Sequence, residues 1–281
     1  MRKIQADPVL TASQYEELGE LLTATAGMVI FAHVCAPGFQ ESNKTSILMN
    51  GLARAAKTLD GVLALYKTKD YQDCWVLVRG MLERYFHLNY LRTTGEYDEF
   101  EAWSFWEQYN IRNKMRSDHE IKGKLDKEFF SDTSAQKARI REFAKDPPSW
   151  NREHPAVSAE RLDLEFLYDF LYRFGSTQTH PYANDGYQDL HSLTGMGLKE
   201  NFPDQRTVLH NACLLTIMLM GECMIGTGRQ WHGMLERFLD ECMDYLKNGD
   251  ARYQATFVQF KDLGPDFEWC RSKPTDGEQA S

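Results

Sequence analysis

The sequence lacks the short motifs that mark the commonest nucleotide-binding and hydrolase sites. It has no GxxxxGK[ST] phosphate loop and no GxSxG nucleophile elbow, and Gly195 and Gly197 lack the third glycine of a dinucleotide fingerprint. The Glu-x-x-His ligand pair of di-iron bundles is also missing, because Glu83 and His87 have three residues between them. We therefore expect neither a metal nor another cofactor.

Paired cysteines and a secretion signal are absent as well. The six cysteines form no CxxC pair and mostly fall in apolar helical patterns, which predicts reduced thiols rather than disulfides or a zinc site. The first ten residues contain no long apolar region followed by a small-residue cleavage site. The most hydrophobic window, Ala212 to Gly226, is about 15 residues long and contains Glu222, whereas a membrane span needs about 20. We expect a cytoplasmic protein that makes no contact with a membrane.

Basic charge is scarce. The chain of 281 residues has a net charge of -9, which argues against broad, sequence-independent binding of nucleic acid. Its apolar and charged fractions, 42% and 26%, are those of an ordinary soluble protein. The exception is the segment 110–145, where ten Lys and Arg stand against six Asp and Glu, a local net charge of +4. This composition predicts a solvated, basic helical insertion.

Alternating strand patterns are absent, and apolar residues instead recur at helical spacing along most of the chain. We predict an all-α bundle that forms a single domain over residues 1–271, followed by a disordered tail at 272–281. Its core helices lie within 11–115 and 162–261, and the long C-terminal helix contains a possible interruption at Gly226-Thr227-Gly228. The expected helices are Thr11–Val34, Thr45–Lys67, Tyr71–Arg92, Tyr97–Met115, Leu162–Gln178, Thr207–Lys247 and Ala251–Lys261.

The helix expected over Tyr71–Arg92 is apolar on both faces, which is typical of a helix buried at the centre of a bundle. A short polar turn at 67–70 precedes it, so it should form an antiparallel hairpin with the helix before it. Arg79, Glu83 and His87 are four residues apart and share one stripe of this helix. Two interpretations are open: a buried seam that recognises an anion or a base, with Glu83 orienting Arg79, or a buried ion pair that only sets helix register.

A second candidate site is the segment Tyr172–Pro181, at the start of a long loop. In a metal-free phosphodiester reaction His180 would transfer a proton and Arg173 would stabilise the charge of the phosphorane. Ser176 or Thr177 would position a phosphate oxygen. The alternative is a plain helix end, in which Arg173 pairs with Asp169.

The chain resembles a family of all-helical bacterial proteins of unknown function that is distantly related to the HEPN-like and abortive-infection helical bundles. The resemblance rests on a helix with Arg54, an Arg-x-x-x-Glu helix at 79–83 and a Tyr-Arg-x-x-Ser-x-x-x-His-Pro segment at 172–181. In HEPN ribonucleases an Arg and a His of two protomers come together and cut RNA through its 2'-hydroxyl without metal. The resemblance thus implicates Arg173 and His180, although Phe174 stands where HEPN nucleases usually carry a polar residue.

These expectations combine into one leading hypothesis and two alternatives. The first is a homodimeric defence- or toxin-type endoribonuclease that needs no metal and binds RNA or a nucleotide. Its pocket would lie between the Tyr71–Arg92 helix and the Arg173–His180 segment. The second is a non-catalytic helical module that binds a nucleotide or a partner protein, and the third is a structural bundle. The residues expected at the pocket are Arg173 and His180 as catalytic groups, and Arg54, Arg79, Glu83, Ser176 and Thr177 as binding groups.

Overall fold

The computed structural model of the chain describes residues 9–36, 38–120, 131–177, 190, 194, 205–261 and 270–271. The described residues are almost entirely helical, which confirms the all-α prediction. His180, most of the loop that follows it, and the C-terminal tail lie outside the described residues. The elements are α1 (Ala12–Cys35), α2 (Asn43–Lys67), α3 (Tyr71–Thr94), α4 (Tyr97–Ser117), α5 (Ser134–Phe143), α6 (Pro155–Arg161), α7 (Glu165–Leu167), η1 (Tyr168–Arg173), α8 (Phe174–Thr177), α10 (Arg206–Gly226), β1 (Gln230–Trp231), α11 (Gly233–Asn248), α12 (Arg252–Lys261) and β2 (Cys270–Arg271).

The chain divides into two compact units. Unit 1 comprises Met1–Tyr90 and His154–Ser281, and unit 2 comprises Leu91–Glu153. That residues 1–271 form a single domain stays a prediction.

The helix starts of unit 1 follow from local side-chain chemistry. Thr11 and Gln14 form a capping box at α1, in which each side chain accepts a hydrogen bond from the other residue's backbone N–H. Ser42 caps α2 by accepting the backbone N–H of Thr45 at 3.2 Å. Both caps use up N–H groups that have no partner within the helix.

The predicted hairpin of α2 and α3 is confirmed by two close approaches across it. A Cβ at Gly51 would lie 2.8 Å from Leu88, and one at Gly61 would lie 3.3 Å from Leu77. These pairs run in opposite directions along the two helices, as antiparallel packing requires. The reversal occurs at Lys69, whose positive φ of 65° belongs to a tight turn.

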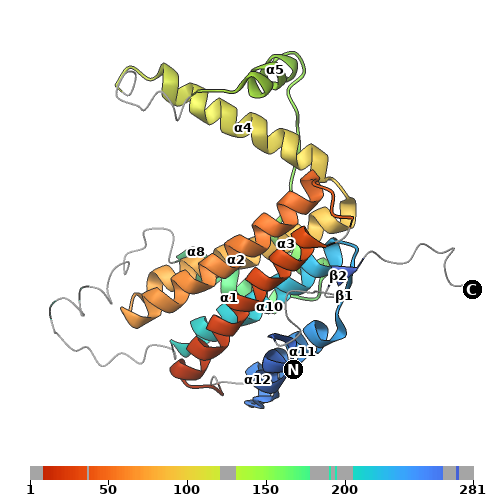
Figure 1. The fold of residues 1–281 in the computed structure, drawn as a ribbon. Coiled ribbons are helices and arrows are strands. Elements are labelled where there is room, and N and C mark those ends of the chain that lie inside the picture. The colour runs from red at the N-terminus through yellow and green to blue at the C-terminus, as the bar shows by residue number, and fades with distance from the viewer. Residues whose placement is uncertain are drawn as a thin grey trace, which may run out of the picture. The chain divides into compact units, whose positions relative to one another are not determined.

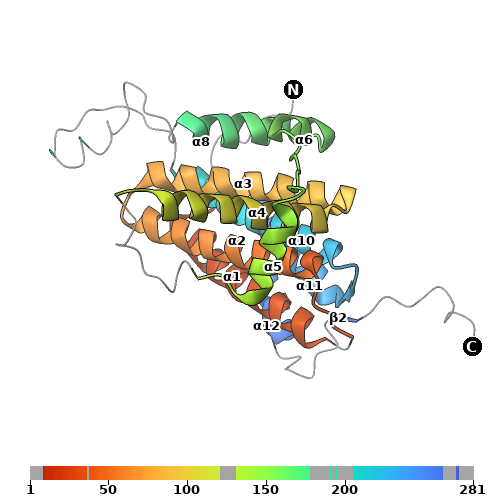
Figure 2. The same ribbon diagram turned by 90° about the horizontal axis from the view of Figure 1, so that it is seen from above.

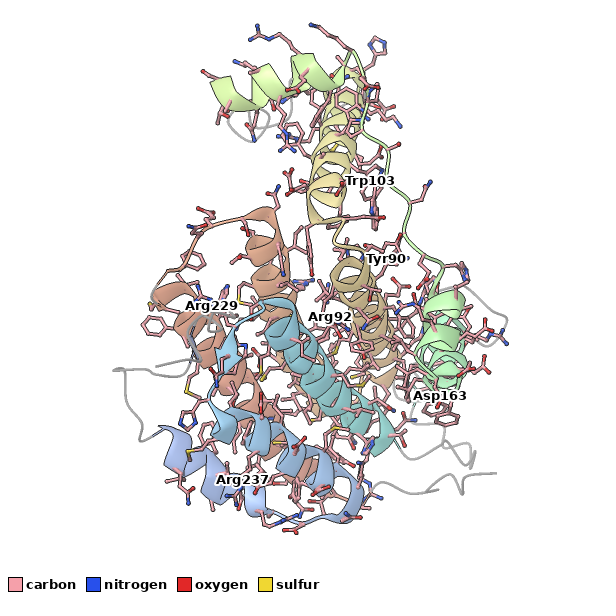
Figure 3. All side chains as sticks on the ribbon, turned by 90° about the vertical axis from the view of Figure 1, so that its right-hand side faces the viewer. Tyr90, Arg92, Trp103, Asp163, Arg229 and Arg237 are labelled. Atoms are coloured by element: carbon pink, nitrogen blue, oxygen red, sulfur yellow. The ribbon has the colours of Figure 1, made fainter. Side chains whose placement is uncertain are left out.

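The most deeply buried helix is α10 rather than α3. It packs against α1, α2 and α11, and most of its side chains are inaccessible to solvent. By contrast α3 keeps a half-exposed stripe, so the prediction that it lies at the centre of the bundle was wrong. Figure 1 shows α1, α2 and α10 alongside one another, and in Figure 2 the row from α6 to α8 runs along α3. Side chains fill the space between these helices, while Asp163 and Arg237 lie on the outside of unit 1 (Figure 3).

Two helices of unit 1, α1 and α10, are long and apolar enough to cross a membrane on length and composition alone. In α10, 72% of the 18-residue apolar window is buried inside the protein, against 44% in α1. A core helix of a water-soluble protein has the same properties as α10. That the protein makes no contact with a membrane stays a prediction.

The predicted long C-terminal helical run is interrupted where its glycines indicated. Gly226 ends α10, and Gly228 adopts a left-handed φ of 67° that turns the chain into β1. Strand β1 pairs with β2 in antiparallel fashion, with Gln230 opposite Arg271 and Trp231 opposite Cys270. This two-residue pair was not visible as an alternating pattern, because it is too short to show one.

Unit 2 is held together differently from unit 1. Its described residues bury only three hydrophobic side chains, those of Leu91, Tyr97 and Trp150. Arg139 of α5 forms an ion pair with Glu101 of α4, which links the two helices. The predicted basic insertion corresponds to the end of α4 and to α5, and α5 buries none of its side chains.

Candidate functional site

The Arg79–Glu83 pair predicted on α3 is formed, with Nη2 of Arg79 3.1 Å from Oε1 of Glu83. The two side chains are 19% and 27% exposed. The seam is therefore half-buried, whereas a fully buried seam was predicted. The four-residue spacing placed them correctly on one stripe. The stripe faces outward because Cys74, Val78 and Met81 take the inward face of the helix.

Gly175 brings α8 into direct contact with α3 beside Arg79. A Cβ at this position would lie 2.8 Å from Cβ of Arg79 and 3.2 Å from the backbone oxygen of Trp75, so only glycine fits without a shift. The rings of Phe170 and Phe174 meet Trp75 edge to face, with centroids 5.7 and 5.1 Å away. The 170–175 segment is therefore fixed on α3 by sterics and aromatic packing.

Two arginines and two tyrosines form a continuous stack on this contact, which we call the arginine–tyrosine ladder. Cζ of Arg79 lies 4.7 Å from the ring centroid of Tyr172. The ring of Tyr172 stacks on that of Tyr168 at 5.0 Å and 17°. Cζ of Arg173 then lies 5.5 Å from the centroid of Tyr168. Tyr168 and Tyr172 are four residues apart, a spacing that places side chains on one helical face, so helical periodicity could have predicted Tyr168 as a member of the ladder.

The other predicted groups of this segment are engaged within their own helix. Arg173 is 69% exposed and pairs with Asp169 at 3.2 Å, which is the plain helix-end arrangement considered from the sequence. The Ser176 hydroxyl donates to the backbone oxygen of Tyr172 at 2.6 Å. The Thr177 hydroxyl donates to the backbone oxygen of Phe174 at 2.7 Å. Because His180 lies outside the described residues, a pocket shared by His180 and Arg173 stays a prediction.

Arg54 of α2 is partnered with a residue that sequence analysis missed, Arg84 of α3. Burial lowers the pKa of Arg84, the charge of Arg54 lowers it further, and Glu83 partly opposes both effects. Among the described residues, no carboxylate lies within 4.0 Å of either guanidinium. We call Arg54 and Arg84 the arginine pair. The predicted hairpin indicates this pair, because Arg54 and Arg84 are each 15 positions from Lys69 at the turn and so lie opposite each other.

A chain of hydrogen bonds centred on the buried Asn89 and Glu222 connects three helices of unit 1. Glu222, 5% exposed within the apolar α10, accepts a hydrogen bond from Asn89 of α3 at 3.1 Å. The amide oxygen of Asn89 in turn accepts from Arg161 at the end of α6, at 2.9 Å. Buried polar groups need such partners, so this chain fixes α6 and α10 on α3. We assign it a structural role.

The part of the chain that the structure describes contains no group of three or more His, Cys, Asp and Glu side chains able to hold a metal ion. Four of the cysteines, Cys74, Cys213, Cys223 and Cys242, are buried thiols, whereas Cys35 is exposed. Burial raises the pKa of Cys74, of Cys213 and of Cys223 to about 12, which keeps these thiols protonated and unreactive at neutral pH.

Comparison with known proteins places the chain among helical proteins whose activity is not assigned. No curated protein matches it. No solved structure matches it either. Residues 45–195 match a family of unknown function, a range that includes the hairpin, unit 2 and the ladder. This confirms the predicted resemblance to a family of unknown function, while the HEPN-like relationship and the motifs at 79–83 and 172–181 stay predictions. The chain belongs to the family of unknown function DUF5677.

Proposed function

We propose that this protein is a helical module that binds the phosphate groups of RNA or a nucleotide through the arginine pair. One observation carries the proposal: Arg54 and Arg84 repel each other across the α2–α3 hairpin, Glu83 offsets this only in part, and no carboxylate of the described residues forms an ion pair with either arginine. Arg84 is half-buried, and a half-buried arginine without a direct ion pair is unusual, because desolvating a charge is costly. A phosphate between the two guanidinium groups removes that cost and accepts several hydrogen bonds.

The arginine–tyrosine ladder supports a ligand that carries bases as well as phosphate. Aromatic faces stack with any base, and a guanidinium near them adds a cation–π contribution. Arg173 is mostly exposed, and its pair with Asp169 is of the surface kind that is worth at most about 1 kcal/mol. A base can therefore displace Arg173 from Tyr168, which leaves the arginine free to contact a phosphate.

The proposal is tested by fluorescence anisotropy of a labelled single-stranded RNA with the full chain at several salt concentrations. We expect Arg84→Gln and Arg54→Gln each to weaken RNA binding about tenfold, because each removes a charge-assisted hydrogen bond. Each should also reduce the slope of log affinity against log salt concentration by about one. Lys57→Gln is the matched control, because Lys57 lies one turn from Arg54, is exposed and pairs with Asp60. If all three variants bind RNA equally, or the wild type does not bind, the proposal fails.

A metal-independent endoribonuclease centred on Arg173 and His180 is the second candidate, in keeping with the HEPN-like resemblance and a homodimer. The exposure of the Arg173 guanidinium favours it, since a phosphate clamp must be accessible. The same RNA incubated with the protein in EDTA distinguishes the two functions. Cleavage that leaves cyclic-phosphate ends and disappears in His180→Ala and Arg173→Ala supports the nuclease. Intact RNA that is bound through the arginine pair supports the binding module.

A further inference from the structure

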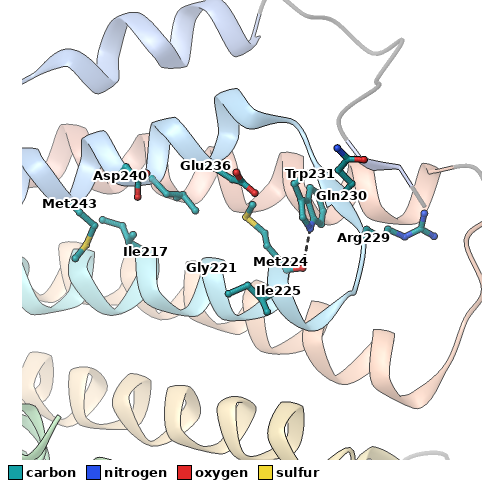
Figure 4. Close-up of a pocket in the computed structure, with 11 residues that line it drawn as sticks. Ile217, Gly221, Met224, Ile225, Arg229, Gln230, Trp231, Glu236, Asp240 and Met243 are labelled. Atoms are coloured by element: carbon teal, nitrogen blue, oxygen red, sulfur yellow. Dashed lines mark hydrogen bonds between the residues drawn. The ribbon is translucent and has the colours of Figure 1, made fainter. Parts of the chain in front are cut away.

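A groove of about 610 Å³ lies between α10 and α11 in unit 1, away from both arginine sites in the sequence (Figure 4). Its apolar lining comes from Ile217, Gly221 and Ile225 of α10 and from Met243 of α11, and Trp231 of β1 borders one end. Ile225 is 65% exposed, which is unusual for a large aliphatic side chain. The volume falls in the range of about 300–1,000 Å³ that is typical of small-molecule sites.

The end of the groove at Trp231 is held rigidly in place. The indole N–H donates to the backbone oxygen of Met224 at 3.0 Å (Figure 4). It also donates to the Thr227 hydroxyl at 3.2 Å. The imidazole of His33 stacks against the indole, with ring centroids 6.3 Å apart. A site wall fixed in this way does not have to be ordered when a ligand binds, which favours affinity.

The uncompensated charge along the groove is negative. Glu236 and Asp240 lie one turn apart on α11, are exposed, and have no ion-pair partner among the described residues. Arg237, between them in sequence, pairs instead with Glu241 at 2.8 Å. The one cation of the lining, Arg229, already interacts with other residues of the chain.

We propose that this groove binds a small organic cation, a molecule with an apolar chain or ring and an ammonium group. The apolar floor takes the body of the ligand, and Glu236 and Asp240 at the rim attract its charge. From Ile217 to Ile225 the floor spans eight residues of helix, about 12 Å at 1.5 Å per residue. That length suits a chain of about eight carbons rather than the several turns of a partner helix.

Isothermal titration of the full chain with octylammonium, 1-octanol and octanoate tests the proposal, because the three probes share one chain and differ in head-group charge. We expect octylammonium to bind most tightly. The double variant Glu236→Gln, Asp240→Asn should lose about tenfold in octylammonium affinity, from two surface-type ion pairs, and should bind 1-octanol as before. Glu165→Gln, an exposed carboxylate on α7, is the charge control and should change nothing.

Gly221→Leu tests the location of the site. A Cβ at Gly221 meets no atom within 4 Å, so the leucine side chain enters the groove without disturbing the fold and should abolish binding of all three probes. Gly27→Leu is the matched control, since Gly27 is also helical and open, on α1. If the probes bind equally to the Gly221→Leu and Gly27→Leu variants, the binding site does not lie in this groove. Tighter binding of octanoate than of octylammonium, or no binding of any probe to a folded wild type, overturns the ligand class.

Discussion

Units 1 and 2 of the same chain are stabilised by different forces. Unit 1 has a continuous apolar interior centred on α10, with helix pairs brought together at glycines such as Gly51 and Gly175. The described part of unit 2 combines contacts between aromatic rings of α4, α5 and Trp150 with the Arg139–Glu101 pair and with Asp132, which is shared by two arginines of α4. The stabilisation from apolar burial grows with the area buried, which is larger in unit 1, whereas each partly exposed ion pair of unit 2 adds only about 1–2 kcal/mol and is weakened by salt. Unit 1 should therefore be the stable part of the chain and unit 2 the part that opens first.

The largest expected effect comes from alkaline pH and falls on unit 1. The pKa values of Cys74, Cys213 and Cys223, raised from 9.0 to about 12 by burial, mean that these thiols stabilise the fold fully below pH 9. The stabilisation is lost as pH rises from 9 towards 12, because the unfolded chain ionises first. At pH 10 the free energy of unfolding should fall by about 1 kcal/mol per thiol, and by several kcal/mol for the three together.

Denaturant unfolding followed by circular dichroism between pH 8 and pH 10.5 measures this loss. Cys213→Ala should lower the number of protons released on unfolding at alkaline pH by one, which makes the unfolding free energy fall less steeply with pH. Cys35→Ala, which removes an exposed thiol, should leave this slope unchanged. The described part of unit 2 contains no cysteine, so its local opening should not share the effect. A flat stability profile up to pH 10.5 would show that the thiols ionise in the folded state.

The second effect is steric. Gly175→Leu forces a Cβ against Cβ of Arg79 and the backbone of Trp75, and backbone cannot move aside as a side chain can. We expect a loss of about 3 kcal/mol in the free energy of unfolding, at the upper end for overpacking. Urea unfolding measures it, with Gly27→Leu as the control that adds the same side chain in open space. Equal urea midpoints for the two variants would mean that α8 is not seated on α3.

The smallest expected effect is a loss of stability in unit 2 alone. Asp132→Asn removes the charge that faces Arg112 at 3.4 Å and Arg116 at 3.0 Å, and should cost about 1–2 kcal/mol, since Asp132 is only 9% exposed. Hydrogen exchange should become faster in α4 and α5 and remain unchanged in α10. Asp244→Asn, whose partner Arg252 is exposed, is the control and should cost less than about 0.5 kcal/mol. Faster exchange in α10 after Asp132→Asn would mean that the two units unfold together.

Most helices and the α2–α3 hairpin could be predicted because their signals are local. Thr11 and Gln14 are three residues apart, and the stripe of Arg79 and Glu83 needs only helical periodicity. The break at Gly226–Gly228 was likewise marked by glycines that permit a left-handed turn. The degree of burial was not predictable in this way. Apolar residues such as Cys74 and Val78 take the inward face of α3, so its polar stripe stays half-exposed, and helical periodicity does not say which face a neighbouring helix will cover.

The sequence by itself determined the helical class, the main helix bounds and the Arg79–Glu83 pair, because each depends on residues a few positions apart. Only the tertiary structure decided that Asn89 meets Glu222 across 133 positions, that Arg79 of α3 lies over the ring of Tyr172 of η1, and that α10 and α11 leave a groove between them. The physical reason is the same in each case. Pairing between distant segments depends on which surfaces can be packed together with the fewest voids and unpaired polar groups, and periodicity along one helix carries no information about the helix that will cover it.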